Sequence, residues 1–189
     1  MSLKKTILDS INHKKKILKL EKKIQSCINL ISSTLIKKQK ILICGNGGSA
    51  ADAQHLAAEF LIRLRPNVKR KSYPVISLAQ DTSTITACGN DLGFNNLFSR
   101  NLEGLGQIND TLITISTSGN SENIIRAIKK AKKMKINSIA FLGKGGGRSK
   151  GLADLELIVD SNSTARIQEC HIFLGHYIFE QVENNLIKN

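Results

Sequence analysis

Aromatic and acidic residues are scarce in this 189-residue chain. It has no tryptophan and two tyrosines, and aromatic residues make up 4% of the whole. Proteins that bind single-stranded nucleic acid stack the bases on aromatic side chains, so this shortage argues against such a site. The 15 Asp and Glu residues are outnumbered by 28 Lys and Arg, which gives a net charge of +13, and eleven of the lysines fall within residues 1–40. We interpret the excess as lysine-rich, solvated helix faces rather than a nucleic-acid interface.

Long apolar runs and paired cysteines are also lacking. No stretch approaches the roughly 18 apolar residues that a membrane helix requires, and the segment MSLKKTILDS lacks the apolar centre of a signal peptide. We therefore expect a cytoplasmic protein with no membrane partner. The absence of a CxxC pair disfavours a disulfide scaffold or a zinc ribbon. The four scattered cysteines are Cys27, Cys44, Cys88 and Cys170.

Residues 1–38 are predicted to form an N-terminal helical segment. Apolar residues recur from Ile17 to Leu35 at the spacing of one helix face, with lysines between them, which predicts a long amphipathic helix. Its single apolar stripe packs either on the protein's own sheet or on the same helix of another subunit. We therefore expect this segment to lie against the domain and at the interface of a homo-oligomer.

Short apolar runs alternate with helical stretches in the rest of the chain. The runs are residues 40–44, 74–78, 111–116, 138–143 and 155–160. Strands that are apolar almost throughout and alternate with helices are typical of a parallel sheet covered on both faces. A last helix from about Ala165 to Ile187 closes the chain. Residues 1–189 are thus predicted to form a single α/β domain, a three-layer αβα sandwich with a five-stranded parallel sheet, whose ligands bind beyond the carboxyl ends of the strands.

The loop after the first predicted strand, Cys44–Ala50, contains three glycines. Glycines permit positive φ angles and let backbone N–H groups approach a ligand oxygen. The loop lacks the GxGxxG pattern and the lysine of a P-loop, which disfavours a dinucleotide or a nucleoside triphosphate. The alternative is a tight strand-to-helix turn that is capped by Ser49.

A second candidate loop, Ser116–Ser121, follows the third predicted strand and precedes a predicted helix over residues 122–134. It offers several hydroxyls and one glycine at a helix N-terminus, where the positive end of the helix dipole also lies. This combination suits a phosphate monoester. A simple N-cap needs only one of the hydroxyls, so we favour phosphate binding over capping.

Side chains suited to a metal lie on two predicted helices. His55 and Glu59 are four residues apart and share a helix face, so they either bind a divalent metal or form a hydrogen-bonded pair that stabilises the helix. Gln168 and His176 are eight residues apart, about 80° around the axis and about 12 Å along it. Both reach one ion only if the helix bends or a second subunit contributes. His171, three residues after Gln168, is left outside the site, and either histidine is alternatively a core residue.

Four ordered motifs together resemble those of the phosphoheptose isomerases, which have the sugar isomerase (SIS) fold. They are GNGGSAADAQHLAAE, the CGND at 88–91, STSGNS, and TARIQE followed by GH at 175–176. The resemblance runs from about residue 10 to the C-terminus. It implies a flavodoxin-like domain, a homotetramer with active sites between subunits, and one Zn²⁺ per subunit. It also implies conversion of D-sedoheptulose 7-phosphate to D-glycero-D-manno-heptose 7-phosphate, the first step of bacterial ADP- or GDP-heptose synthesis for lipopolysaccharide or capsule.

The resemblance also implies which residues form the site. The metal ligands of the family correspond to His55, Glu59, Gln168 and His176. Its substrate contacts correspond to Asn46, Gly47, Gly48, Asn90, Asp91, Ser116, Thr117, Ser118, Ser121 and Gln168. The glycine loop itself argues for adding Ser49. Some family members carry an acidic residue immediately before the arginine of RIQE, where this chain has Ala165, so the role of that carboxylate is absent or falls to Asp91.

The implied chemistry matches these residue types. A ketose becomes an aldose when a proton leaves C1, a cis-enediol(ate) forms, and a proton returns at C2. Glu59 suits the base, and the resemblance places His176 as the acid toward the sugar oxygens. Zinc can polarise the carbonyl and stabilise the charge of the enediolate. A carboxylate bound strongly to zinc is a weaker base, so the two roles predicted for Glu59 compete, unless zinc is mainly structural.

Two other functions remain open at this stage. The first is a non-catalytic binding protein of the bacterial replication initiator-associating type, which shares the fold and much of the loop pattern. That protein lacks residues matching Glu59 and His176, whereas this chain has both. The second is an isomerase or lyase of another sugar phosphate that uses the same phosphate loop.

Overall fold

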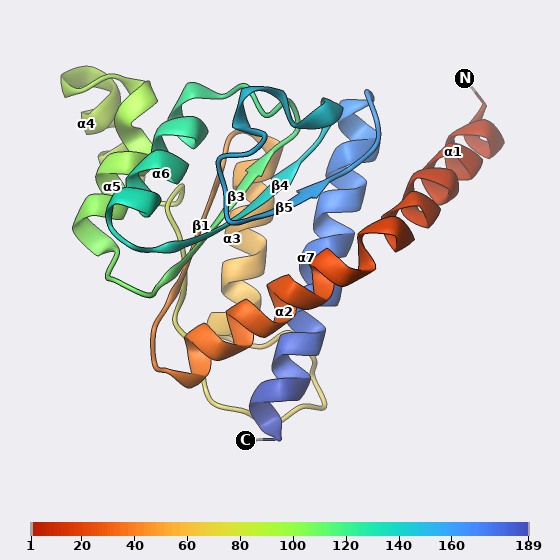
Figure 1. Ribbon diagram of the computed structural model, residues 1–189, viewed down its shortest axis with the longest axis horizontal. Helices are drawn as coiled ribbons and strands as arrows, with labels where there is room; N and C mark the ends of the chain where they lie inside the picture. The colour runs from red at the N-terminus through yellow and green to blue at the C-terminus, as the bar shows by residue number, and fades with distance from the viewer. Residues whose placement is uncertain (1, 189) are drawn as a thin grey trace.

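The computed structural model describes residues 2–188, which form one parallel sheet with helices on both faces (Figure 1). Each neighbouring pair of strands is parallel, and the order across the sheet is β2-β1-β3-β4-β5. The strands are β1 (Ile41–Gly45), β2 (Val75–Ser77), β3 (Thr111–Ser116), β4 (Asn137–Leu142) and β5 (Leu155–Ile158). The predicted five-stranded αβα sandwich is confirmed, with strand ends that differ from the prediction by one or two residues.

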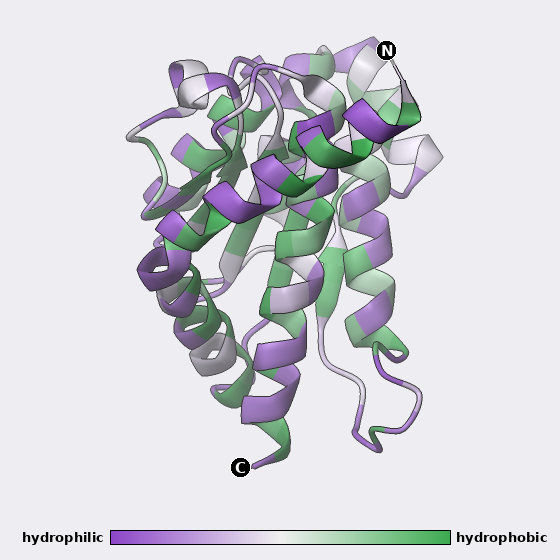
Figure 2. Ribbon diagram, turned by 90° about the vertical axis from the view of Figure 1, so that its right-hand side faces the viewer, coloured by the Kyte–Doolittle hydropathy of each residue, from purple (hydrophilic) through white to green (hydrophobic). Residues whose placement is uncertain are grey.

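Alternate side chains of the strands supply two separate apolar layers. Ile41 and Ile43 of β1 face one layer, and Leu42 and Cys44 face the other. The first layer is covered by α2 (Glu21–Ile36), α3 (Gly48–Leu61) and α7 (Thr164–Ile187). The second is covered by α4 (Thr82–Asp91), α5 (Leu97–Leu105) and α6 (Glu122–Lys133). Figure 2 shows the strands as largely hydrophobic ribbon, whereas hydrophobic and hydrophilic residues alternate along the helices.

The N-terminal segment is helical, as predicted, but a short 3₁₀ turn divides it. The turn η1 (Ile17–Leu20) separates α1 (Leu3–Lys16) from α2. The apolar stripe of α2 packs on the protein's own core, so this part of the segment is accounted for within one chain. None of the residues 3–16 is buried, and α1 projects from the body of the molecule (Figure 1).

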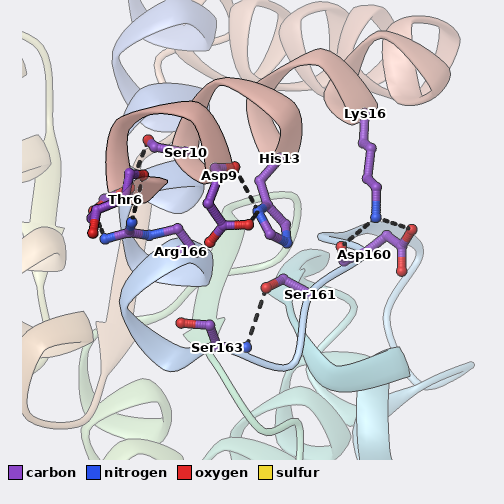
Figure 3. A network of polar contacts seen from close by, with 10 residues as sticks. Thr6, Asp9, Ser10, His13, Lys16, Asp160, Ser161, Ser163 and Arg166 are labelled. Carbon is purple, nitrogen blue, oxygen red and sulfur yellow. Dashed lines mark hydrogen bonds and ion pairs between the residues drawn. The ribbon is translucent and has the colours of Figure 1, made fainter. Parts of the chain in front are cut away.

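Polar contacts connect α1 to the start of α7, as Figure 3 shows. Ser10 Oγ donates a hydrogen bond of 2.8 Å to a carboxylate oxygen of Glu169. The guanidinium of Arg166 donates to the backbone carbonyl of Thr6 at 3.1 Å, and Lys16 forms a 3.0 Å ion pair with Asp160 in the preceding loop. These contacts orient α1 without burying its apolar side chains.

Two further expectations concern cysteines and membranes. All four cysteines are buried and free within the described part of the chain, as the absence of paired motifs indicates. Among residues 2–188, every helix is too short or too polar to cross a membrane.

Candidate active site

Two loops meet at the carboxyl edge of the sheet, between β1 and β3. From β1 the chain turns into α3 on one face, and from β3 it turns into α6 on the other, so these adjacent strands form the topological switch point where such sheets bind ligands. Asn46 and Asn123 join the two loops, because each side-chain amide donates to the other's oxygen at 2.9 Å. Asn46 is among the site residues predicted from the sequence, and Asn123 is not.

The glycine loop leads directly into α3. Gly47, with φ of 55°, occupies the N-cap position, and no side chain of residues 2–188 caps this helix. Ser49 lies inside the first turn and is buried. It is therefore not the N-cap, as it would be if the loop were only a tight strand-to-helix turn capped by Ser49. The side-chain amide of Gln168 lies against Gly48, where an added Cβ would be 2.5 Å from Nε2. The loop therefore brings the start of α7 next to the start of α3.

The second loop, Ser116–Ser121, which we call the serine loop, is held in shape by its own hydroxyls. Ser116 Oγ accepts a hydrogen bond from the Gly119 amide, and Ser118 Oγ accepts one from the Asn120 amide, both at 3.1 Å. Gly119 has φ of 64°, and a Cβ there would lie 1.9 Å from the carbonyl oxygen of Gly146, so only glycine fits. Ser121 is the N-cap of α6 but makes no capping hydrogen bond through its side chain to the described residues. A capping role thus leaves the hydroxyl of Ser121 unexplained.

Three side chains from two helices converge on the outer side of α3 and α7. His55 Nε2 lies 3.1 Å from Glu59 Oε1 and 2.9 Å from His176 Nε2, and His176 Nε2 lies 3.5 Å from the same carboxylate oxygen. One ligand atom from each of the three lies within 4.8 Å of the others. No other such group of His, Cys, Asp or Glu occurs among residues 2–188. If His55 and Glu59 only stabilised their own helix as a hydrogen-bonded pair, His176 of α7 would have no reason to join them.

A close approach of α3 and α7 brings these side chains together. Gly175 packs on Leu56 so tightly that an added Cβ would lie 2.6 Å from a Leu56 methyl group. One turn further on, the rings of Phe60 and Phe179 are in edge contact with centroids 4.4 Å apart. Close packing therefore explains why a glycine precedes His176, since a larger residue would push α7 away from α3.

The three side chains are a group that could hold a metal ion, and two carboxylate oxygens on the same face of α3 lack a hydrogen-bond partner among residues 2–188. Glu59 Oε2 is buried and has no hydrogen-bond partner among the described residues, and the same holds for Asp52 Oδ2 one helix turn before His55. Burial raises the pKa of Glu59 and of Asp52, and the imidazoles of His176 and His55 partly oppose this. Two imidazoles and a carboxylate are a donor set that Zn²⁺ accepts. Asp52 is absent from the predicted site residues, although its spacing of three and seven residues from His55 and Glu59 places it on their face.

The two remaining candidates on α7 are separated by the helix. Gln168 lies at the glycine loop, and α7 continues unbroken to His176 eight residues later, about 12 Å along the axis. Gln168 therefore does not join the cluster of its own chain. His171 is 1% exposed and its Nε2 lies 3.2 Å from the carbonyl oxygen of Leu142, and burial lowers its pKa to about 4. His171 is therefore a core residue, which was the alternative to a ligand role, and it lies outside the cluster as predicted.

Asn90 and Asp91 lie at the end of α4, in the helix layer opposite to α3 and α7. Both are exposed, and the Asn90 amide donates to the Asp91 carboxylate at 2.7 Å. The fold does not bring them to the cluster of His55, Glu59 and His176 within one chain. Their predicted contact with substrate stays a prediction.

The chain is similar to known proteins over most of its length. A family model described as "SIS domain" matches residues 7–143. A phosphoheptose isomerase of Clostridium acetobutylicum is 48% identical over 183 residues, which cover 95% of this chain and 92% of that protein. The solved phosphoheptose isomerases of Neisseria gonorrhoeae (38% identity, TM-score 0.88, 96% and 97% of the two chains) and Francisella tularensis (33% identity, TM-score 0.92, 96% of each chain) are similar throughout. The chain therefore belongs to the phosphoheptose isomerases, a family of SIS-domain enzymes.

Proposed function

We propose that this enzyme converts D-sedoheptulose 7-phosphate to D-glycero-D-manno-heptose 7-phosphate through a cis-enediol(ate). The observation that carries the proposal is the convergence of Glu59 with His55 and His176 on two helices, α3 and α7. The N-terminal ends of these helices lie at the glycine and serine loops, which we call the phosphate-type loops. The names of the relatives support the same reaction. This step is the first in making activated heptose for a surface polysaccharide such as lipopolysaccharide or capsule, and it suits a cytoplasmic, single-domain protein.

The serine loop is the proposed anchor for the phosphate. Thr117, Ser118 and Ser121 supply hydroxyl donors at the N-terminus of α6, where the helix dipole also favours an anion. The backbone of Gly47 and Gly48 approaches from the adjacent loop, with Asn46, Ser49 and Ser116 beside it. We assign Asn90 and Asp91 to the sugar hydroxyls, as the family pattern implies.

Glu59 and His176 are the proposed general base and general acid, and we call them the proton carriers. The Glu59 carboxylate takes a proton from C1 of the open-chain ketose, and His176 gives a proton to the oxygen on C2, which yields the enediol. Glu59 then returns its proton to C2, and His176 recovers a proton from the oxygen on C1. Each side chain ends in the protonation state in which it began, and the product is the aldose. The 3.5 Å between the two side chains lets them act on neighbouring atoms of one substrate.

The donor set also supports one Zn²⁺ per subunit, held by His55, Glu59 and His176. When bound, such an ion polarises the substrate carbonyl and stabilises negative charge on oxygen. We place Gln168 of a second subunit as the fourth ligand or as a substrate contact, because a chain's own Gln168 is about 12 Å from its own His176 along α7. Zinc binding weakens Glu59 as a base and occupies a ring nitrogen of His176, so the metal and proton-transfer roles compete at both residues and the rate should depend on metal content.

A homotetramer with active sites between subunits is the proposed assembly. The helix α1 exposes Leu3, Ile7, Leu8 and Ile11 to solvent in a single chain. Beside it, a groove of about 250 Å³ runs between the N-terminal helices and α7, lined by apolar residues that include Leu18 and by the rings of Phe173 and Tyr177. Apolar surface of this extent is typical of a face that contacts another protein surface.

The test is an assay of sedoheptulose 7-phosphate conversion by the purified protein, with and without added zinc. Glu59→Gln keeps the side-chain shape and removes the base, so we expect kcat/KM to fall at least about 100-fold with the oligomer intact. Glu180→Gln is the matched control, because it removes a neighbouring carboxylate that lies outside the cluster. Full activity in Glu59→Gln would remove Glu59 from catalysis.

Parallel assays with a pentose and a hexose phosphate test the choice of substrate. We expect the seven-carbon ketose to be turned over with the highest kcat/KM. Preference for a shorter ketose phosphate would replace the proposed substrate and keep the chemistry. No turnover of any of the three by a folded protein would favour a non-catalytic binding protein.

A further inference from the structure

The segment between α3 and β2, which includes residues 65–73, folds back and caps the C-terminus of α3. The last carbonyls of a helix lack partners within the helix, and here they receive donors from the returning segment. Arg70 Nη2 donates to the carbonyl of Glu59 at 2.6 Å, and Arg70 Nη1 donates to that of Phe60 at 3.0 Å. Ser72 Oγ donates to the carbonyl of Leu61 at 2.7 Å. Figure 1 shows this segment near the C-terminus, at the end of α3 opposite to the glycine loop.

The same guanidinium is also bound to α7. Arg70 Nε donates to Glu183 Oε1 at 2.5 Å, and the second oxygen of Glu183 accepts from Arg65 Nε at 2.6 Å. The Glu183 side chain is fully buried, and that of Arg70 is 4% exposed. Arg70 further lies over the rings of Phe60 and Tyr73, 5.2 and 5.7 Å from their centroids. A planar group with this many partners has one orientation only.

These contacts connect the two helices that carry the proton carriers. On α3, Arg70 binds the backbone carbonyl of Glu59 itself. On α7, Glu183 follows His176 by seven residues, which is two helix turns along the same face. Any shift of the Arg70–Glu183 contact therefore moves the backbone of Glu59 relative to the helix of His176.

We propose that Arg70 and Glu183 are positioning residues that set the distance between Glu59 and His176 in the active enzyme. The proposal rests on the function proposed above, since it concerns the same pair. It adds a role for two buried residues that touch neither the cluster's side chains nor the phosphate-type loops. Arg70 acts through the backbone of Glu59, and Glu183 acts by holding Arg70.

Arg65 offers a matched comparison within the same cluster. It donates to Glu183 and, through Nη2, to Asn184 at 2.7 Å, so both of these partners lie on α7. Arg65→Lys changes the contact of one Glu183 oxygen, Oε2, and keeps both the bond of Arg70 to the other oxygen and the bonds of Arg70 to the carbonyls of α3. A lysine at position 70 keeps the charge opposite Glu183, yet its single nitrogen cannot reproduce the fork that reaches Glu59, Phe60 and Glu183 together.

The experiment compares Arg70→Lys and Arg65→Lys in the full-length protein, well below the unfolding midpoint of each. For Arg70→Lys we expect kcat to fall at least about tenfold with KM changed by less than about threefold, because misplacement of about 1 Å can cost two orders of magnitude in rate. For Arg65→Lys we expect kcat within about threefold of wild type. Glu183→Asp, which keeps the charge and draws the carboxylate back, should lower kcat in the same way and serves if Arg70→Lys does not fold.

A second measurement keeps the proposal separate from the catalytic assignment. Binding of Co²⁺ alone, followed by its visible absorption, reports the arrangement of His55, Glu59 and His176 without substrate. We expect an altered spectrum and at least about tenfold weaker binding in Arg70→Lys, with a wild-type spectrum in Arg65→Lys. If the wild type lacks isomerase activity, the proposed function fails and the Co²⁺ comparison still decides the positioning role. Lowered unfolding midpoints with unchanged kcat and unchanged Co²⁺ binding in Arg70→Lys would show a merely structural role and overturn the proposal.

Discussion

The buried histidine of α7 should make the folded protein sensitive to mild acid. His171 is 1% exposed, and its Nε2–H donates to the carbonyl oxygen of Leu142 at 3.2 Å. Its Nδ1 has no partner within residues 2–188, so a second proton there would be buried without compensation. Burial lowers the pKa of His171 from 6.5 to about 4. The folded state therefore strongly favours the neutral form of the His171 imidazole.

The size and sign of the effect follow from this difference. The unfolded chain binds the proton at the higher pKa, so the free energy of unfolding falls as the pH drops below about 6.5 and stops falling near pH 4. The full loss is roughly 3 kcal/mol, and most of it, about 2.5 kcal/mol, is reached at pH 4.5. Asp52 and Glu59 act in the opposite direction, because burial raises their pKa values and their protonation stabilises the folded state.

A variant isolates the contribution of His171 from those carboxylates. His171→Phe keeps a ring beside Phe141 and removes the titration, and the carbonyl of Leu142 keeps its hydrogen bond from the Val159 amide at 2.8 Å. Urea unfolding at pH 7.0, 5.5 and 4.5 should show a steeper loss of stability in the wild type than in the variant. His13→Gln, a histidine replacement on the exposed α1, controls for loss of any imidazole. Equal pH dependence in wild type and His171→Phe would refute this reasoning.

Two further predictions concern the phosphate-type loop and the metal. Alanine at both Ser118 and Ser121 removes two hydroxyl donors, each worth about 1.5–3 kcal/mol to a charged group, so KM for the phosphorylated sugar should rise more than about tenfold. The unfolding midpoint should change little, because the internal hydrogen bond that is lost, from the Asn120 amide to Ser118 Oγ, is exposed to solvent. A changed midpoint with unchanged KM would reduce these serines to a structural role. His55→Ala removes one of three grouped donors, and elemental analysis of protein purified without chelator should find less than about a tenth of the wild-type zinc. Equal zinc content in both proteins would contradict the ligand assignment.

Local patterning determined the architecture. Five apolar runs separated by helical stretches predict a covered parallel sheet because both faces of each strand must be apolar, and the two buried layers on β1 show this directly. The sequence also determined that His55 and Glu59 share a face, since four residues make about one helix turn. The 3₁₀ turn at Ile17–Leu20 was not predictable in this way, because the apolar spacing runs through it unbroken.

Only the tertiary structure decided which distant residues meet. His176 joins His55 and Glu59 because Gly175 lets α7 pack on Leu56, whereas Gln168 on the same helix lies at Gly48. The contacts of Arg70 with α3 and of Glu183 with Arg70 likewise span more than one element. Periodicity reports which face of an element is buried, but the pairing of faces depends on side-chain volumes and backbone approach over the whole core. That packing determines which of the predicted side chains lie within reach of one another in a single chain.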